Sequence, residues 1–125
     1  MTDVNTLIQR YIDTWNETDS ARRRTLIAEV FTEDASYTDP LVAVRGQGSI
    51  DQFVATAQAQ FAGLRFSLGG PVDAHHDQAR FAWHLAAPGS SEPVVIGFDV
   101  AVMHAGRMRE VYGLLDKAPS AAAPA

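Results

Sequence analysis

The sequence predicts a single α+β domain, in which three helices are followed by an antiparallel sheet. Apolar residues recur at helical spacing over the first half of the chain, and the period changes to two from Leu64 onward. Four breaks rich in glycine, proline or turn-forming residues divide the second half into four or five strands. Helices that precede a run of strands favour a curved sheet that packs against the helices.

Two amphipathic helices are predicted near the start of the chain. The first spans about Asn5 to Glu17, because one face of this segment is apolar. The residues on that face are Leu7, Ile8, Tyr11, Ile12 and Trp15. Asp19 or Ser20 can cap the second helix, and the arginine run at 22–24 is expected to face water. The core-facing residues of the second helix are Leu26, Ile27, Val30 and Phe31.

A third helix is predicted after Ser49, which forms a capping-box pattern with Gln52 three residues later. The apolar residues that follow at helical spacing are Ile50, Phe53, Val54, Ala57 and Phe61. Gly63 is a plausible stop, because glycine readily adopts the conformation that ends a helix.

The strands are predicted from alternating apolar residues. Two alternating sets are Leu64, Phe66 and Leu68, and Ala79, Phe81, Trp83 and Leu85. The breaks between strands are Gly69-Gly70-Pro71, His75-His76-Asp77, Pro88-Gly89-Ser90-Ser91 and Ala105-Gly106. The break at 75–77 is interpreted as a turn rather than a metal site, because adjacent hairpin residues point apart and no third ligand has a fitting spacing. One of Trp83 and His84 faces the interior, and the sequence leaves open which.

The composition limits the classes of function. The chain has 125 residues and 46% hydrophobic content, which fits one domain over residues 1–117 and a disordered Ala/Pro tail at 118–125. A net charge of -5 without a basic stripe disfavours a nucleic-acid partner. Cysteine is absent, no apolar run approaches the length of a membrane helix, and the first residues lack a signal-peptide pattern. A cytoplasmic protein without a membrane partner is the expectation.

Asp99 is the most informative residue, because it lies in a strand whose other side chains are apolar or absent. Both faces of this strand look buried. The residues that share a face with Asp99 are Val95, Gly97, Ala101 and Met103. A buried, unpaired charge costs several kcal/mol or more, so Asp99 must accept hydrogen bonds, for example from Trp83, or stay protonated. Its small neighbours leave space for a ligand above the sheet.

Several segments together resemble the nuclear transport factor 2-like superfamily, in particular its SnoaL-like branch. These segments are Arg10-Tyr11-Ile12, Glu33 to Pro40, Arg45-Gly46, Gly97 to Val102, Gly106-Arg107-Met108 and Val111 to Asp116. The resemblance covers nearly the whole chain. It implies a cone-shaped barrel of a strongly curved, mostly antiparallel sheet, closed by three N-terminal helices around an apolar pocket. It also implies a homodimer that pairs through the sheet.

Within this superfamily, ketosteroid isomerase places a tyrosine on its first helix, an aspartate before a proline, and a second aspartate in its penultimate strand. The counterparts here are Tyr11, Asp39 and Asp99. The resemblance implies that Asp39 is the general base next to a carbonyl, while Tyr11 and a protonated Asp99 donate hydrogen bonds to the enolate oxygen. The expected pocket-lining residues are Trp15, Phe53, Trp83, Gly97, Ala101, Met103, Val111, Gly113 and Leu115. The implied ligand is a small hydrophobic ketone, polyketide or steroid, with no cofactor.

Other functions remain open at this point. A polyketide cyclase would use Asp99 alone as acid and base, and an accessory domain of the same fold would bind a hydrophobic ligand without chemistry. A protein-interaction module would need an exposed apolar patch outside the pocket. The individual residues also have structural explanations: Tyr11 as a core tyrosine bonded to a backbone carbonyl, and Asp39 as the residue that shapes a turn before Pro40.

Overall fold

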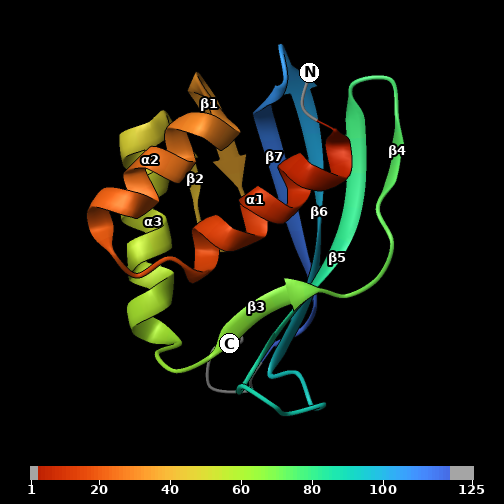
Figure 1. Ribbon diagram of the computed structural model, residues 1–125. Coiled ribbons are helices and arrows are strands. Elements are labelled where there is room, and N and C mark those ends of the chain that lie inside the picture. Colours follow the sequence, from red (N-terminus) through yellow and green to blue (C-terminus); the bar gives the residue numbers. More distant parts are fainter. Residues whose placement is uncertain (1–2, 119–125) are drawn as a thin grey trace.

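The computed structural model describes residues 3–118 and has three helices and seven strands (Figure 1). The helices are α1 (Val4–Asn16), α2 (Ser20–Val30) and α3 (Gln47–Gln60). The strands are β1 (Phe31–Thr38), β2 (Ala43–Arg45), β3 (Arg65–Leu68), β4 (Asp73–His75), β5 (Gln78–Ala86), β6 (Val95–His104) and β7 (Arg107–Lys117). The predicted α+β class is confirmed. The tail predicted at 118–125 lies outside the described residues except for Ala118, and it stays a prediction.

The strands form one curved sheet in the order β2-β1-β7-β6-β5-β3, with β4 also paired to β5. Strands β1 and β7 run parallel, and the other pairs are antiparallel. The two ends of this order, β2 and β3, leave the sheet open, so it is a cone-like curved sheet rather than a closed barrel. Figure 1 shows α1 across one face of the sheet, with α2 and α3 on the side of β1 and β2.

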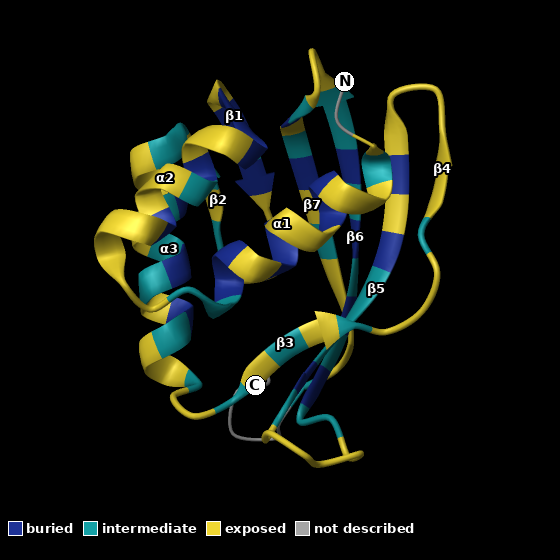
Figure 2. Cartoon of the chain, in the orientation of Figure 1, coloured by how far each residue is buried: buried dark blue, intermediate teal, exposed yellow. Residues whose placement is uncertain are grey.

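The side of the sheet that faces α1 carries the core. Residues along β6 alternate between buried and half-buried positions, a pattern that Figure 2 shows by colour. The buried set includes Val95, Gly97, Asp99 and Ala101, as the predicted alternation requires. The expectation that both faces of this strand are buried is wrong. The opposite face is only half-buried, because no element of the described chain covers it, and its residues are Ile96, Phe98, Val100 and Val102.

Strands β1 and β2 precede α3, whereas the sequence predicted strands only after the third helix. Phe31, predicted on the second helix, caps the end of α2 and begins β1. The segment that follows contains Glu33 and Asp34 in succession and has a weak strand pattern. It is extended because β1 pairs with β7, about 75 residues later, so the stabilising partner is remote in sequence.

Helix α3 begins at Gln47, and the predicted capping box at Ser49 is wrong. Gly46 occupies the N-cap with a φ of 91°, and no side chain caps the helix. The Gly46 carbonyl accepts a hydrogen bond from the backbone N–H of Ile50 at 3.0 Å, which starts the helical ladder. Because glycine tolerates positive φ, the helix starts before Ser49, and Ser49 lies inside its first turn.

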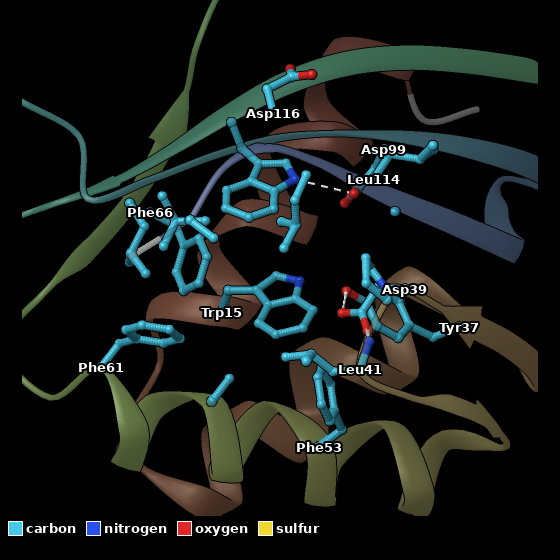
Figure 3. A pocket seen from close by; sticks show the side chains of 18 of the residues that line it. Trp15, Tyr37, Asp39, Leu41, Phe53, Phe61, Phe66, Asp99, Leu114 and Asp116 are labelled. Carbon is cyan, nitrogen blue, oxygen red and sulfur yellow. Dashed lines mark hydrogen bonds between the residues drawn. The ribbon is translucent and has the colours of Figure 1, made fainter. Parts of the chain in front are cut away.

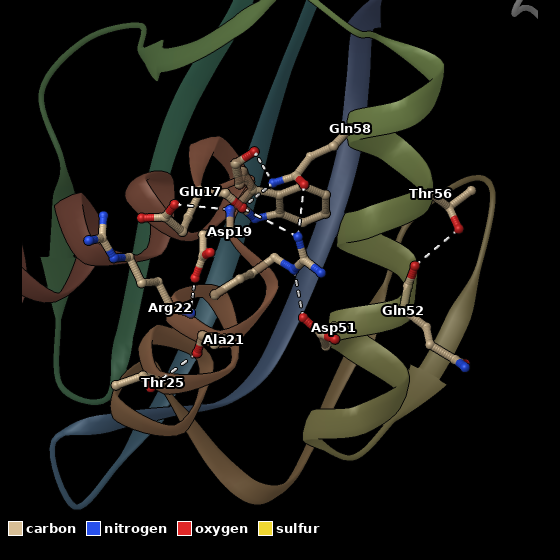
Figure 4. Close-up of polar contacts among 11 residues, drawn as sticks. Glu17, Asp19, Ala21, Arg22, Thr25, Asp51, Gln52, Thr56 and Gln58 are labelled. Atoms are coloured by element: carbon tan, nitrogen blue, oxygen red, sulfur yellow. Dashed lines mark hydrogen bonds and ion pairs between the residues drawn. The ribbon is translucent and has the colours of Figure 1, made fainter.

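The arginine run does not face water throughout, because Arg23 is buried. Its Nε donates to Asp51 Oδ1 at 2.6 Å, and its Nη1 donates to Gln58 Oε1 at 3.0 Å. Gln58 in turn donates to the backbone carbonyls of Trp15 and Glu17 at 3.1 and 2.8 Å. Figure 4 shows Asp51 and Gln58 on α3 facing the end of α1. This polar cluster fixes all three helices to one another.

The four breaks predicted in the second half of the chain lie at the connections between strands, as expected. The turn between β4 and β5 is at His76 and Asp77, where His76 has a φ of 52°. Among residues 3–118, no group of three or more His, Cys, Asp or Glu side chains is arranged to hold a metal ion. Within the same range, no helix combines the length and apolar composition that crossing a membrane requires.

Candidate functional site

A cavity of about 770 Å³ lies between the sheet, α1 and α3. Its walls are mainly apolar and include many aromatic residues, and Figure 3 shows several of these rings pointing inward. The aromatic residues that line it are Tyr11, Trp15, Tyr37, Phe53, Phe61, Phe66 and Trp83, whereas Tyr112 borders it beside Gly113 with its side chain on the outer face of the sheet. Rings of this size supply apolar contact area without many rotatable bonds. The cavity therefore suits a flat, hydrophobic ligand.

Trp15 is the centre of the aromatic wall. Its ring centroid lies 5.5 Å from those of Tyr37 and Phe66 and 6.0 Å from that of Phe53. The backbone on both sides is fixed by side-chain amides: Gln58 donates to the Trp15 carbonyl, and Asn16 exchanges two hydrogen bonds with the backbone of Phe66 at 2.8 and 2.9 Å. The wall is therefore held in place before any ligand binds.

Asp99 lies deep in this cavity and is 2% exposed. Its Oδ2 accepts a hydrogen bond from the Tyr11 hydroxyl at 2.6 Å, and its Oδ1 accepts one from Trp83 Nε1 at 3.1 Å. Burial and, to a smaller extent, the nearby charge of Asp39 raise the pKa of Asp99 from 3.8 to about 6, against the lowering effect of these two donors. Asp99 therefore exchanges a proton close to neutral pH.

Tyr11 is fully buried against the rings of Phe31 and Phe81, at centroid distances of 5.9 and 5.5 Å. Tyr11 is a core residue, as the structural explanation required, but the backbone-carbonyl acceptor in that explanation is wrong, because the hydroxyl donates to Asp99. Burial, followed by the charge of Asp99, raises the pKa of Tyr11 well above its ordinary value. Tyr11 therefore remains a hydrogen-bond donor at any physiological pH.

Asp39 is half-buried directly after β1, and it is separated from Asp99 by strand β7. Its Oδ1 accepts from the backbone N–H groups of Leu41 and Val42 at 2.8 and 3.1 Å, which is the turn-shaping role considered from the sequence. Its Oδ2 accepts from the Tyr37 hydroxyl at 2.8 Å. Asp39 thus both shapes the turn and presents a fixed carboxylate to the cavity.

Tyr37 was missed as a site residue. It lines the cavity, and burial together with the charges of Asp99 and Asp39 raises its pKa well above the ordinary value. The signal was present in the sequence, because Tyr37 and Asp39 are two residues apart and so share one face of an extended segment.

Gly113 on β7 separates the two carboxylates. It pairs with Asp99 across the sheet, and a side-chain carbon at this position would lie 2.9 Å from Asp99 Oδ1 and 3.3 Å from the Asp39 Cβ. Gly97 on β6 has a different role, since a side chain there would lie 2.7 Å from the Trp83 Cε2. The first glycine keeps the space between the carboxylates open, and the second allows Trp83 to lie against the sheet.

The structure places five of the nine predicted lining residues at the cavity: Trp15, Phe53, Trp83, Gly113 and Leu115. The other four, Gly97, Ala101, Met103 and Val111, share the correct face but do not line it. The Trp83 side chain covers Gly97, while Ala101 and Val111 are fully buried in the core. Trp83 faces the cavity, and His84 faces the opposite side, where its ring lies beside Gly69.

Several proteins of known structure share this architecture. One from Agrobacterium tumefaciens str. C58, provisionally named an isomerase of the SnoaL-like family, is 38% identical, with 93% of this chain and 99% of that chain covered and a TM-score of 0.85. Two others show the shared fold at lower identity. A provisionally named ketosteroid isomerase from Kribbella flavida is 19% identical (95% and 81% covered, TM-score 0.67), and a provisionally named polyketide cyclase from Sinorhizobium meliloti is 16% identical (86% and 92% covered, TM-score 0.65).

The sequence itself gives the family. No protein with a curated description matches the chain. The family model of the SnoaL-like domain, in contrast, matches residues 8–111, which include Tyr11, Asp39 and Asp99. This match spans most of the sequence, and the fold is that of nuclear transport factor 2-like proteins. The chain therefore belongs to the SnoaL-like domain family.

Proposed function

We propose that this protein is an enzyme that moves a proton next to the carbonyl of a small hydrophobic ketone. The observation that supports this most is the pair of carboxylates, Asp39 and Asp99, on either side of Gly113 in one aromatic cavity. Asp39 has backbone donors and partial exposure, whereas Asp99 is deeply buried with a pKa of about 6. Carboxyl groups in such unlike environments are suited to act as a base and an acid at the same pH.

The proposed step has Asp39 as the base. The C–H bond next to the carbonyl breaks, its proton passes to Asp39 Oδ2, and the electron pair forms the enolate. A protonated Asp99 donates from Oδ1 to the enolate oxygen, and Tyr11 holds that carboxyl group in place through Oδ2. With a pKa of about 6, roughly a tenth of Asp99 is protonated at pH 7. A positioned base contributes about 100- to 10,000-fold to such a step.

The ketone class follows from the wall of the cavity. Its volume of about 770 Å³ accommodates a fused-ring or polyketide-like skeleton, and its rings provide stacking surfaces. A proton transfer of this kind proceeds through protein side chains alone, so no cofactor forms part of the proposal.

The experiment uses 2-tetralone in D2O, because exchange of its α-protons for deuterium can be followed by NMR without knowing the natural substrate. Wild type is compared with Asp39→Asn and with Asp73→Asn, which alters an exposed carboxylate on β4. We expect wild type and Asp73→Asn to exchange at the same catalysed rate. We expect Asp39→Asn to lose at least about 100-fold. Equal rates in wild type and Asp39→Asn would overturn the assignment of Asp39.

A cyclase-type role for Asp99 alone is separated by the same assay. Asp99 would then be the proton acceptor in its ionised form, which the hydrogen bonds from Tyr11 and Trp83 orient in the cavity. In that case Asp99→Asn loses the exchange while Asp39→Asn retains it. The two variants therefore assign the base.

A ligand-binding domain without chemistry is the second candidate, and one observation favours it. The hydroxyls of Tyr11 and Tyr37 and the indole N–H of Trp83 already donate to the two carboxylates. An enolate oxygen would have to draw its donors from these bonds. A fluorescence titration with 2-naphthol tests this candidate: tight binding without α-proton exchange of any ketone tested would support it, and catalysed exchange would exclude it.

We propose that two copies pair through the outer face of the sheet. This face carries half-buried apolar residues on β6, and beside them Tyr112, which pairs with Val100, is 41% exposed on β7. A stable interface buries about 800 Å² on each partner, which a sheet face of this kind can supply. Analytical ultracentrifugation of wild type and Phe98→Asp tests the pairing. A dimer that becomes a monomer is expected, and a monomeric wild type would overturn it.

A further inference from the structure

We infer that the cavity also binds hydrophobic ammonium ions, whose N–H groups donate to Asp99 and Asp39 while the carbon skeleton lies against the aromatic wall. This goes beyond the proposed proton transfer, because it needs the cavity and its carboxylates but no reaction. The ligand class is defined by chemistry: a cationic nitrogen with at least one N–H, attached to a flat apolar group.

The hydrogen bonds around the carboxylates carry the inference. Each carboxylate oxygen can accept about two hydrogen bonds. Asp99 accepts one on each oxygen, from Tyr11 and Trp83. Asp39 accepts two on Oδ1, from backbone N–H groups, and one on Oδ2, from Tyr37. Acceptor positions therefore remain on Asp99 and on Asp39 Oδ2, while the three side-chain donors beside them are engaged. Because acceptor positions are free and donors are not, a ligand that donates hydrogen bonds fits this site better than one that accepts them.

Gly113 makes the free acceptor positions of Asp99 and Asp39 accessible to a ligand. A side chain at this position would lie against Asp99 Oδ1, the Asp39 Cβ and the Tyr37 hydroxyl, at 2.9, 3.3 and 3.7 Å. Gly113 lines the cavity, and its φ is not in the left-handed region, so its backbone does not require glycine. Glycine within a strand weakens it and often marks a close approach by a ligand. Here the absence of a side chain allows one functional group of a ligand to contact both carboxylates.

The charges around this point have one sign. The titratable groups that face Asp99 are Tyr11 from α1, Tyr37 from β1 and Asp39 at the end of β1, and both tyrosines stay neutral. The only cationic side chain that lines the cavity within the described residues is Lys117. Its Nζ donates to the Pro93 carbonyl at 2.8 Å. A positive ligand therefore complements the inner end of the cavity.

The aromatic wall supplies the second half of the recognition. Trp15 and Tyr37 lie 5.5 Å apart between ring centroids, and the Tyr37 hydroxyl contacts Asp39 directly. Aromatic faces attract cations, most strongly where water is excluded. A nitrogen held near the carboxylates thus lies beside rings that favour its charge, and the attached skeleton extends along Trp15 toward Phe66 and Trp83.

The experiment compares two ligands of matched shape, 2-(2-naphthyl)ethylamine and 2-(2-naphthyl)ethanol, by isothermal titration calorimetry with the full chain. The amine stays protonated from pH 5 to pH 8, as alkyl amines do. At pH 8 we expect it to bind at least about tenfold more tightly than the alcohol. At pH 5, where Asp99 is protonated, we expect the preference to fall to about threefold or less.

Variants identify the groups responsible. Asp99→Asn and Asp39→Asn should each reduce the preference for the amine at pH 8, while Asp73→Asn, the exposed control, should leave it unchanged. Because Asp39 is half-buried, its variant tests the inference even if Asp99→Asn does not fold. Equal affinities of amine and alcohol at pH 8, or a preference that survives in both site variants, would overturn the inference. Failure of ketone exchange would not, since that assay reports a reaction and this one reports binding.

Discussion

Asp99 should make the protein less stable as the pH rises from about 4 to about 7. Its pKa is 3.8 in the unfolded chain and about 6 in the folded protein, mainly because burial disfavours the charged form. Between these values the folded state holds a proton that the unfolded state has released. The stabilisation is therefore complete below the lower pKa and is lost as the pH passes through the higher one.

The size of the effect follows from the same two values. A pKa raised from 3.8 to about 6 corresponds to about 3 kcal/mol of unfolding free energy. Since small domains are stable by only about 5 to 15 kcal/mol, this is a large fraction of the total. Other carboxyl groups titrate over the same range, so the contribution of Asp99 has to be measured as a difference between proteins.

The assay is urea unfolding from pH 4.5 to pH 8, followed by the fluorescence of Trp15 and Trp83, which both line the cavity. The difference in unfolding free energy between wild type and Asp99→Asn should change by about 2 kcal/mol across this range, in the direction that favours wild type at low pH, since part of the effect lies below pH 4.5. The difference between wild type and Asp73→Asn should stay nearly constant. Parallel stability curves for wild type and Asp99→Asn would refute the reasoning, because Asp99 would then have the same pKa in both states.

Three further predictions concern the residues that support the site. Trp83→Phe removes a donor that lowers the pKa of Asp99, so the pKa should rise above about 6 in a carbon-13 NMR titration; an unchanged or lower value would contradict this. Arg23→Met leaves Asp51 and Gln58 without their partner and should lower the unfolding free energy by about 3 kcal/mol, whereas the exposed Arg24→Met should change it little. Gly97→Ala pushes against Trp83 and should cost about 1 to 3 kcal/mol in thermal or urea unfolding, and equal loss in Gly70→Ala, which has open space, would argue against this cause.

Local patterns in the sequence account for α1, the N-cap of α2 and the five later strands. Asp19 caps α2 by accepting from the backbone N–H of Arg22 at 2.9 Å, within three residues of itself. What the sequence did not predict depends on remote partners. Strand β1 needs β7, and the burial of Arg23 needs Asp51 and Gln58 on α3. Neither contact has a periodic signal, because each joins segments that only the folded chain brings together.

The candidate site likewise has features that the sequence predicted and features that depend on contacts between remote segments. The alternation along β6 placed Asp99 on the inner face, and the resemblance to the superfamily singled out Tyr11 and Asp39. The sequence offered Trp83 as a donor to Asp99, and the structure has this bond. That the Tyr11 hydroxyl also donates to Asp99 could not be read from spacing, since it depends on how α1 lies across the sheet. The same limit applies to Ala101 and Val111, which share the inner face but lie under other side chains.

The protonation state of Asp99 links the proposed reaction to the inferred ligand. An enolate oxygen needs a proton on Asp99, while an ammonium ion needs Asp99 ionised, so the two should respond to pH in opposite directions around its pKa of about 6. The hydrogen bonds from Tyr11 and Trp83 lower the pKa of Asp99 and therefore favour its ionised form, which is the form that an ammonium ion needs. Asp39 raises the pKa of Asp99 through its charge, so a cation bound between the two carboxylates lowers that pKa and a neutral ketone does not. A hydrophobic amine should consequently inhibit ketone exchange more strongly as the pH rises, because each bound cation removes the protonated form of Asp99 that the reaction requires.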